Sequence, residues 1–371
     1  MNLKGKKVVV GMSGGVDSSV SALLLKQAGA EVIGMFMKNW DDNKEQSACR
    51  AQEDYDDVKN VCQKLDIPYY PIEFVEEYRR FVFDKFVSDL KKGLTPNPDI
   101  LCNREIKFKR FFDQAMAIGA DYLATGHYCQ NINGQLVKGL DGNKDQTYFL
   151  YTMKKEILEK VLFPIGHLEK STVRQLAKEH DLITSDKKDS TGICFIGEKN
   201  FKKFISDYLP YKKGEFRSLD EEVVGHHNGS AFYTLGQRKG LGLGGPGEPW
   251  FVVKKDTENN IVYVERGEHP SLYSYELYAT ELTLVDGLSI LKQECNAKIR
   301  YRQKDQSCTV EQMGDRLKVS FKDPQRAITP GQSIVFYQGD VCLGGAIIEK
   351  SGPTLFESTN SLDHESQNLL I

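Results

Sequence analysis

An apolar run that turns through glycines into a helix lies near the start of the chain, in the stretch VVVGMSGGVDSS (8–19). Three consecutive valines, Val8 to Val10, predict a buried parallel strand, because uninterrupted β-branched residues suit a strand that is covered on both faces. Apolar residues then recur at helical spacing as far as Gly29, which predicts a helix directly after the glycines. Backbone N–H groups of a glycine turn and the positive end of a helix dipole both favour a bound anion. The stretch therefore predicts a phosphate site behind the first strand.

The glycine spacing differs from that of two common nucleotide loops. The stretch has no G-x-x-x-x-G-K-[ST] pattern, so the loop itself carries no lysine that could reach a γ-phosphate. The glycines also do not follow the dinucleotide pattern G-x-G-x-x-G. Instead, Ser13 to Ser18 read S-G-G-x-D-S, which resembles the pyrophosphate loop (PP-loop) of enzymes that split ATP between the α and β phosphates. We therefore expect an ATP pyrophosphatase domain; the alternative is an ordinary tight turn of an α/β domain.

Length and composition bound the number of domains and the class of protein. A chain of 371 residues, 40% hydrophobic and 27% charged, is typical of a globular protein with two or three domains. No apolar run reaches the roughly 18 residues that a membrane span needs, and MNLKGKK leads at once into the first strand. We therefore expect no targeting segment, no membrane association and a cytoplasmic location. The eight cysteines form no C-x-x-C pair, so we expect most of them to be reduced and buried.

Charge is unevenly distributed along the chain. The formal net charge of −3 does not by itself indicate a nucleic-acid binder. Residues 41–57, however, contain seven acidic and two basic side chains, whereas residues 187–213 contain seven lysines and three acidic side chains. A basic segment on a mildly acidic protein favours an anionic partner that binds at one place.

Strand and helix patterns alternate through the first half of the chain. The apolar run 31–37 predicts a second strand, the spacing of apolar residues over 58–65 predicts a helix, and 122–125 predicts a later strand. Such alternation predicts an α/β domain over residues 1–200 with a doubly wound parallel sheet, whose ligands bind at the carboxyl ends of the strands. Met37 and Gly126 follow two of these ends, and we expect them to line an adenosine pocket with the glycine loop. Ordinary core and turn positions are the alternative.

The second half has a different texture. Beyond Pro210, short β-branched and aromatic runs alternate with Gly, Asp and Asn, which is typical of all-β structure. We expect a central linking domain over residues 201–275, a C-terminal β-barrel over 276–360 and a frayed tail over 361–371. The predicted architecture is thus an α/β domain followed by two smaller β-rich domains.

A proline-rich loop, TPNPDILCN (95–103), presents three reactive side-chain types between two predicted helices. Its prolines fix their own φ angles and favour extended backbone before them, so the loop is stiff. Asn97 can pair with a base edge, Asp99 can accept or transfer a proton, and Cys102 can act as a nucleophile. The basic residues that follow favour the thiolate and attract phosphate. A structural cysteine in a connector is the alternative.

A second cysteine, Cys194, lies in the glycine-flanked stretch DSTGICFIG (189–197), preceded by Lys187 and Lys188. Glycines permit unusual backbone conformations, and nearby lysines lower the pKa of a thiol. Because Phe195 and Ile196 follow directly, Cys194 in isolation is equally compatible with a place in the core.

Taken together, these stretches resemble the bacterial tRNA-specific 2-thiouridylases, which place sulfur on C2 of the wobble uridine. The matching pieces cover about residues 1–350 in order: GMSGGVDSS (11–19), GMFMKNW (34–40), TPNPDILCNREIKFK (95–109), ATGHY (124–128), KDQTYFLY (144–151), DSTGICFIGE (189–198), TLGQRKGLGLGG (234–245) and RYRQ (300–303).

The resemblance implies a role for each matched site residue. The implied ATP-binding residues are Gly11, Met12, Ser13, Gly14, Gly15, Val16, Asp17, Ser18, Met37 and Gly126. The residues implied to meet the target base or the tRNA are Asn97, Pro98, Asp99, Lys144, Asp145, Gln146, Arg300 and Tyr301. Cys102 and Cys194 are implied to be catalytic, with Cys194 carrying the transferable sulfur as a persulfide and Asp99 helping proton transfer.

The resemblance also implies the reactants and partners. ATP would adenylate the C2 oxygen of the uridine, with Mg²⁺ held through the ATP phosphates rather than by direct protein ligands. The partners would be the tRNAs for Lys, Glu and Gln and a persulfide donor, either a desulfurase or a relay protein, and the chain would act as a monomer. The target base would have to leave its stack to be reached. Whether Cys102 releases free sulfide or forms a disulfide with Cys194 stays open.

Three other functions compete with this interpretation. A PP-loop amide ligase would share the first domain but has no need for Cys102 and Cys194. An iron–sulfur-dependent tRNA thiolase needs about three cysteine ligands, and Cys49, Cys62 or Cys129 would have to supply the third without convincing spacing. An adenosine-binding module without enzymatic activity would bind nucleotide but consume no ATP in response to tRNA.

Overall fold

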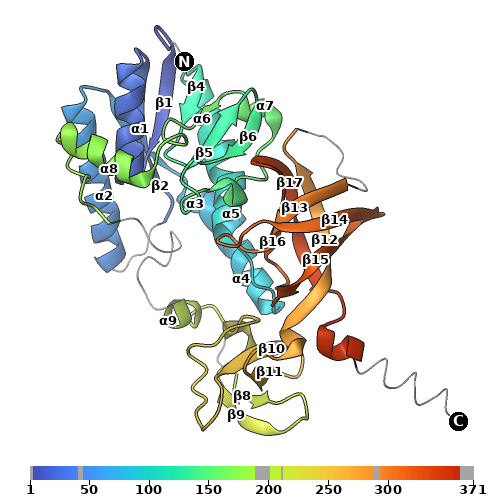
Figure 1. Ribbon diagram of the computed structural model, residues 1–371. Helices are drawn as coiled ribbons and strands as arrows, with labels where there is room; N and C mark the ends of the chain where they lie inside the picture. The colour runs from blue at the N-terminus through green and yellow to red at the C-terminus, as the bar shows by residue number, and fades with distance from the viewer. Residues whose placement is uncertain (1–2, 41–44, 189–200, 210–211, 287–292, 360–371) are drawn as a thin grey trace, which may run out of the picture.

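The computed structural model describes residues 3–40, 45–188, 201–209, 212–286 and 293–359. These residues form an α/β body, a small β-sheet body and a β-barrel (Figure 1). Cys194 and residues 189–200 around it lie outside the described residues. No helix in the described part of the chain combines the length and the apolar character that crossing a bilayer requires.

The first body is built on a five-stranded sheet in the order β3-β2-β1-β4-β7. Its strands are β1 (Lys7–Met12), β2 (Glu31–Lys38), β3 (Tyr69–Glu73), β4 (Tyr122–Ala124) and β7 (Val161–Leu162), and all of its neighbours pair in parallel. Val8, Val9 and Val10 are fully buried; Val9 packs in one hydrophobic cluster and its two neighbours pack in another. Both faces of the sheet are therefore covered, and the predicted doubly wound parallel sheet is confirmed.

Helices follow the strands of this sheet. They are α1 (Val16–Gln27), α2 (Glu45–Lys64), α3 (Val75–Tyr78), α4 (Asp84–Lys91), α5 (Pro98–Cys102), α6 (Phe112–Ala117), α7 (Lys155–Leu158) and α8 (Lys170–Glu179). Two π-helical stretches, η1 (Arg79–Phe83) and η2 (Asn103–Phe111), join α3 to α4 and α5 to α6. Wide π-helical turns are rare and occur often at functional sites.

A hairpin leaves the first body and joins the barrel. Its strands β5 (Cys129–Ile132) and β6 (Gln135–Lys138) are connected by Asn133 and Gly134, which have φ values of 53° and 79°. Positive φ at both central residues matches the right-handed twist of the strands, which explains why Asn-Gly stands at this turn. Strand β6 pairs antiparallel with β17 of the barrel through Val137 and Val341.

The C-terminal body is a closed barrel. Its strands are β12 (Tyr273–Leu284), β13 (Gln293–Lys298), β14 (Gln306–Met313), β15 (Arg316–Arg326), β16 (Ser333–Gln338) and β17 (Val341–Ser351). The order β12-β15-β14-β13-β16-β17 closes through an additional pairing of β12 with β17. Closure leaves the barrel without open strand edges.

The middle body holds a four-stranded sheet in the order β10-β11-β8-β9. Its elements are α9 (Phe201–Ile205), β8 (Gly214–Arg217), β9 (Val223–His227), β10 (Trp250–Asp256) and β11 (Ile261–Arg266). Two short 3-10 helices, η4 (Ser230–Phe232) and η5 (Pro270–Leu272), follow β9 and β11. A further 3-10 helix, η3 (Thr147–Phe149), lies in the first body. In Figure 1 this sheet lies beside the end of α4 and below the barrel.

Candidate active site

The glycine loop is held in place by its own serines. Gly15 is the N-cap of α1, with φ of −97° and ψ of 165°. The backbone N–H of Ser13 donates to the Ser18 hydroxyl over 3.2 Å. The hydroxyls of Ser18 and Ser19 in turn donate to the carbonyl oxygen of Gly15, over 3.1 and 2.9 Å. These bonds fold the loop back over the start of α1, where the helix dipole favours an anion.

Two glycines are required by close backbone approaches. Gly14 has a φ of +75°, and a Cβ at this position would lie 2.6 Å from the carbonyl oxygen of Asp54 in α2. A Cβ on Gly126, which follows β4, would lie 2.8 Å from the backbone nitrogen of Ser18 and 2.9 Å from the carbonyl carbon of Asp17. The segment after β4 thus lies directly against the first turn of α1, as expected for the carboxyl ends of neighbouring parallel strands.

The other residues assigned to ATP differ in what they can offer. Met12 and Val16 are 1% and 3% exposed, so neither side chain is open to a ligand in this structure. A Cβ on Gly11 would lie 3.3 Å from the ring of Phe111, the last residue of the π-helical stretch η2 that follows Cys102. Met37, near the end of β2, is half-buried and packs against the core. Their roles in ATP binding stay predictions.

The carboxylate of Asp17 is held by two side chains from outside the loop. The Lys170 ammonium nitrogen lies 2.7 and 2.8 Å from the two carboxylate oxygens. The Tyr128 hydroxyl donates to one of them over 2.7 Å. The Lys170 side chain is 12% exposed and that of Asp17 is 31% exposed. The loop therefore has an ammonium group beside its acidic residue, although its own sequence contains no lysine.

The proline-rich loop becomes a helix start. Asn97 is the N-cap of α5, and its side-chain oxygen accepts from the backbone N–H groups of Asp99 (3.0 Å) and Ile100 (3.4 Å). Pro98 occupies the first helical position, where a missing N–H costs nothing. Burial raises the pKa of the Asp99 carboxyl, and the charge of Lys107 acts in the opposite direction. A carboxyl with a raised pKa is suited to proton transfer.

Asp99 should accordingly reduce stability at neutral pH. A pKa that is higher in the folded than in the unfolded protein means that stability falls as the pH rises from the unfolded pKa through the folded one. We expect Asp99→Asn to increase the free energy of unfolding near neutral pH, and this gain to shrink toward about pH 4, where the unfolded carboxyl titrates. Urea titrations of both proteins across this range measure the difference. The prediction would be wrong if the free energy of unfolding of Asp99→Asn at neutral pH were equal to or lower than that of the unmodified protein.

Cys102 ends α5 and is 2% exposed. The π-helical turn η2 begins at the next residue, Asn103, whose side-chain nitrogen donates to the carbonyl oxygen of Phe149 over 3.1 Å. The side-chain oxygen of Asn103 is buried and has no hydrogen-bond partner. Cys102 thus lies beside an unsatisfied acceptor in an irregular helix. The catalytic role of Cys102 stays a prediction, as does that of Cys194, which lies outside the described residues.

The segment 141–147 connects the glycine loop with the barrel. The side-chain oxygen of Gln146 accepts from the backbone N–H of Tyr128 over 2.9 Å, and the backbone of Gln146 donates to the carbonyl oxygen of Tyr128 over 2.9 Å. On the other side, the Tyr301 hydroxyl lies 3.5 Å from the carbonyl oxygen of Lys144. Gln146, which the family resemblance assigns to tRNA, therefore contacts Tyr128, and Tyr128 in turn contacts Asp17.

Asp145 is the buried centre of this segment, at 5% exposure. Its carboxylate accepts from the backbone N–H of Gly139 (3.2 Å) and from the hydroxyl of Thr147 (2.9 Å). The ammonium of Lys298 in β13 lies 3.6 Å from it. An ionised group that is buried needs such partners. In this structure Asp145 therefore joins the first body to the barrel, and its contact with tRNA stays a prediction.

Arg300 joins the barrel to the middle body. Its guanidinium donates to the carbonyl oxygens of Ala327 (3.0 Å) and Leu235 (3.4 Å). Burial lowers the pKa of Arg300, and the charge of Arg326 adds to this effect. The neighbouring Tyr301 ring lies 4.5 Å from the ring of Phe149, centroid to centroid. The two residues that the sequence assigned to tRNA thus lie where all three bodies approach one another.

The acidic and basic segments of the chain meet beside the loop. The ammonium of Lys187 lies 2.7 Å from the carboxylate of Asp54 and 2.5 Å from that of Asp57. Both carboxylates belong to α2, which also contacts Gly14. Part of the basic charge that the sequence suggested for an outside anion is therefore neutralised within the molecule.

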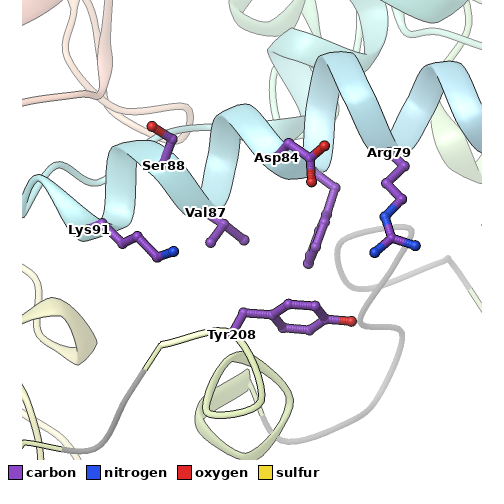
Figure 2. Close-up of a pocket in the computed structure, with 7 residues that line it drawn as sticks. Arg79, Asp84, Val87, Ser88, Lys91 and Tyr208 are labelled. Carbon is purple, nitrogen blue, oxygen red and sulfur yellow. The ribbon is translucent and has the colours of Figure 1, made fainter.

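A separate pocket of about 370 Å³ lies between η1, α4 and the residues after α9. Figure 2 shows its side chains: Arg79, Asp84, Val87, Ser88, Lys91 and Tyr208. Arg79 and Lys91 lie at opposite ends, and the Tyr208 ring faces the helix between them. The lining contains no residue of the glycine loop, so this pocket is distinct from the proposed phosphate site.

Comparison with known proteins assigns the family. Residues 6–198 match the model described as tRNA methyl transferase HUP domain, 202–266 its PRC-barrel domain and 274–348 the aminomethyltransferase beta-barrel domain. The chain is 58% identical to the tRNA-specific 2-thiouridylase MnmA of Protochlamydia amoebophila over 97% of this chain and 98% of that one. It is 54% identical to the protein of the same name from Oceanobacillus iheyensis, over 98% and 99%. This chain belongs to the tRNA-specific 2-thiouridylase family.

Two solved structures show partial likeness to this member of the 2-thiouridylase family. An NMN synthetase from Francisella tularensis is 20% identical with a TM-score of 0.34, over 54% of this chain and 72% of that one. A 4-thiouridine synthetase in complex with RNA and ATP is 18% identical with a TM-score of 0.34, over 53% and 46%.

Sequence reasoning on the 2-thiouridylase motifs missed two residues that contact Asp17. Tyr128 lies inside the matched stretch ATGHY but received no role, because its ring gave no reason to expect a bond to the loop. Lys170 lies 153 positions beyond Asp17 at the start of an ordinary amphipathic helix. Nothing in its neighbourhood marks it, and only the docking of α8 against α1 reveals it.

Proposed function

We propose that this chain catalyses the ATP-dependent 2-thiolation of the wobble uridine of tRNA, giving 2-thiouridine, AMP and pyrophosphate. The observation that carries the proposal is the 54–58% identity to tRNA-specific 2-thiouridylases over nearly the whole of both chains. The serine-braced glycine loop supports it, because such a loop suits the binding of a polyphosphate.

ATP binding would involve the loop and the two neighbouring strand ends. In this proposal the backbone N–H groups of residues 11–18 hold the phosphates, and Met37 and Gly126 border the adenosine. Mg²⁺, held through the ATP phosphates, would offset charge on the departing pyrophosphate. Asp17 and its partners fit such a site, because their charges lie at the first turn of α1.

The first chemical step would activate the base. The C2 oxygen of the uridine attacks the α-phosphorus of ATP, an O–P bond forms, and the bond from the α-phosphorus to the bridging oxygen breaks to release pyrophosphate. Asn97 and Pro98 would border the extruded base, and Asp99 would handle its proton. Asn97 also caps α5 and Asp99 lies one turn before Cys102, so this short helix would hold the base-binding groups in fixed relation to the thiol.

The second step would deliver sulfur. The persulfide of Cys194 supplies its outer sulfur to C2, and AMP leaves with the former C2 oxygen. In one route, Cys102 would attack the Cys194 sulfur of the persulfide, which releases sulfide to attack C2 and leaves a Cys102–Cys194 disulfide. In the other route, the outer sulfur would first bond to C2 while still attached to Cys194. Cys102 would then attack the Cys194 sulfur, which frees the thiolated base and forms the same disulfide. Both routes end in a disulfide that a cellular thiol reductant must reopen. Because Cys102 is 2% exposed, access to it requires a local movement when RNA binds.

The remaining residues and partners complete the proposal. Lys144, Asp145, Gln146, Arg300 and Tyr301 would contact tRNA or hold its binding surface. A PP-loop domain over residues 1–200, a linking domain over 201–275 and a barrel over 276–360 would share the RNA, with 361–371 as a tail. The tRNAs would be those for Lys, Glu and Gln, the sulfur donor a desulfurase or relay protein, and the enzyme a cytoplasmic monomer.

One experiment tests the function directly. Two transcripts that differ only in uridine or cytidine at the wobble position are incubated with the chain, ATP, Mg²⁺ and a persulfide donor. Nucleoside mass spectrometry should detect 2-thiouridine in the first transcript alone, with AMP and pyrophosphate formed in equal amounts. Sulfur in the cytidine transcript, or AMP formation that does not depend on RNA, would contradict the proposal.

A further inference from the structure

We propose that Lys170 is a phosphate-binding residue of the ATP site, whose ammonium contacts the β and γ phosphates of bound ATP while it stays beside the carboxylate of Asp17. The proposal rests on the proposed function, since it assumes that the glycine loop binds ATP. The glycine loop contains no lysine that could bind the phosphates, and Lys170 of α8 would supply that positive charge.

The position of the Lys170 ammonium supports this role. It lies within 2.8 Å of both carboxylate oxygens of Asp17, and Asp17 is in the first turn of α1. It also lies 5.5 Å from the centre of the Tyr128 ring, a distance at which the ring attracts a cation. The ammonium is therefore already beside the N–H groups that a phosphate would meet at the start of α1.

The start of α8 is fixed by the segment that follows the hairpin. The backbone N–H of Lys170 donates to the carboxylate of Asp141 over 3.1 Å, at the first residue of the helix. The Lys170 backbone is thus anchored, while its four-carbon side chain can turn between neighbouring acceptors without moving the helix. The side chain is only 12% exposed, so water competes weakly for the ammonium.

Charge explains why a cation is needed at this position. A carboxylate at the mouth of a phosphate site repels ATP unless a cation offsets it, and Lys170 is that cation for Asp17. Negative charge then accumulates on the β-phosphate as the bond to the α-phosphorus breaks. An ammonium that is already in place stabilises this charge without reorganisation of the site. Lys170 would thus act both on ATP binding and on departure of pyrophosphate.

A purely structural role is the competing explanation, in which Lys170 only ties α8 to α1. The two roles differ in their dependence on the phosphates. Calorimetric titration with ATP, pyrophosphate and AMP should show that Lys170→Met weakens ATP and pyrophosphate about tenfold or more, while AMP binding stays unchanged. The matched control is Lys178→Met, which removes an exposed lysine of the same helix that also pairs with an aspartate.

The Asp17→Asn background separates the roles further. If Lys170 only holds Asp17, then Lys170→Met has no additional effect once the carboxylate is gone. If Lys170 binds phosphate, the double variant Asp17→Asn, Lys170→Met binds pyrophosphate about tenfold more weakly than Asp17→Asn alone. Both proteins in this comparison lack the Asp17 carboxylate. Loss of Lys170 therefore leaves no unpaired carboxylate at position 17 that could disturb folding. Lys170→Arg, which keeps the cation, should retain most of the affinity.

The outcomes distinguish this inference from the proposed function. Equal ATP and pyrophosphate affinity in Lys170→Met and Lys178→Met, in a chain that thiolates tRNA, would overturn the role of Lys170 alone. Equal loss for AMP and ATP would also overturn it. A chain that shows the predicted phosphate-specific loss but does not thiolate tRNA would leave Lys170 assigned and overturn the function. A chain that binds neither ATP nor pyrophosphate would overturn both.

Discussion

Cys194→Ser is expected to abolish formation of 2-thiouridine while leaving ATP binding intact. A serine oxygen cannot carry the transferable sulfane sulfur, so no sulfur reaches C2 however well the base is adenylated. Removal of a group that takes part in covalent catalysis lowers turnover by roughly a thousandfold or more. Nucleoside mass spectrometry of the tRNA measures the loss, and calorimetric titration with ATP measures binding.

The control for this prediction is Cys308→Ala. Cys308 lies in the barrel, where it pairs across two strands with Cys295 and is buried. A general sensitivity to loss of a cysteine would reduce activity in this variant as well, whereas the proposed mechanism leaves it active. Normal thiolation by Cys194→Ser would remove Cys194 from the mechanism.

Gly126→Ala is expected to weaken ATP binding about tenfold or more, because an added methyl group would force apart two packed backbones at a cost of about 1–3 kcal/mol. The new Cβ would lie 2.8 Å from the backbone nitrogen of Ser18 and 2.9 Å from the carbonyl carbon of Asp17. Neither atom can yield by rotation of a side chain. The first turn of α1 must move instead, and with it the N–H groups that hold the phosphates.

Gly142→Ala is the matched control for this substitution. A Cβ on Gly142 meets no atom within 4 Å, so the same chemical change is made without a clash. Titration with ATP and a thermal melt of both variants separate loss of binding from loss of fold. Equal ATP affinity in Gly126→Ala and the unmodified chain would show that the segment after β4 does not support the phosphate site.

The features that sequence reasoning predicted correctly are local ones. Three buried valines, the glycine turn and the helix after it are neighbours in the chain. Each is therefore predicted from the pattern of apolar residues and glycines in one short segment. Most of the cysteines were expected to be buried, and this holds for Cys62, Cys102, Cys129, Cys295, Cys308 and Cys342.

The features that were missed depend on distant docking. The pairing of β6 with β17 joins residues about two hundred positions apart, and no pattern in either strand names its partner. The π-helical turns η1 and η2 lie within segments of ordinary amphipathic spacing, and that spacing does not distinguish a π-helical from an α-helical turn. Lys170 reaches Asp17 only because α8 docks beside α1. Such contacts are selected by the whole fold rather than by local preference.

The attachment of the hairpin to the barrel has a mechanical consequence. Strand β6 is bonded to β17, and Lys138 at its end contacts Asp305 over 2.6 Å. The chain continues from there to Gln146, whose side-chain oxygen accepts a hydrogen bond from the backbone of Tyr128. The hydroxyl of Tyr128 donates a hydrogen bond to Asp17. A displacement of the barrel relative to the first body would therefore be transmitted through these contacts to the carboxylate at the start of α1.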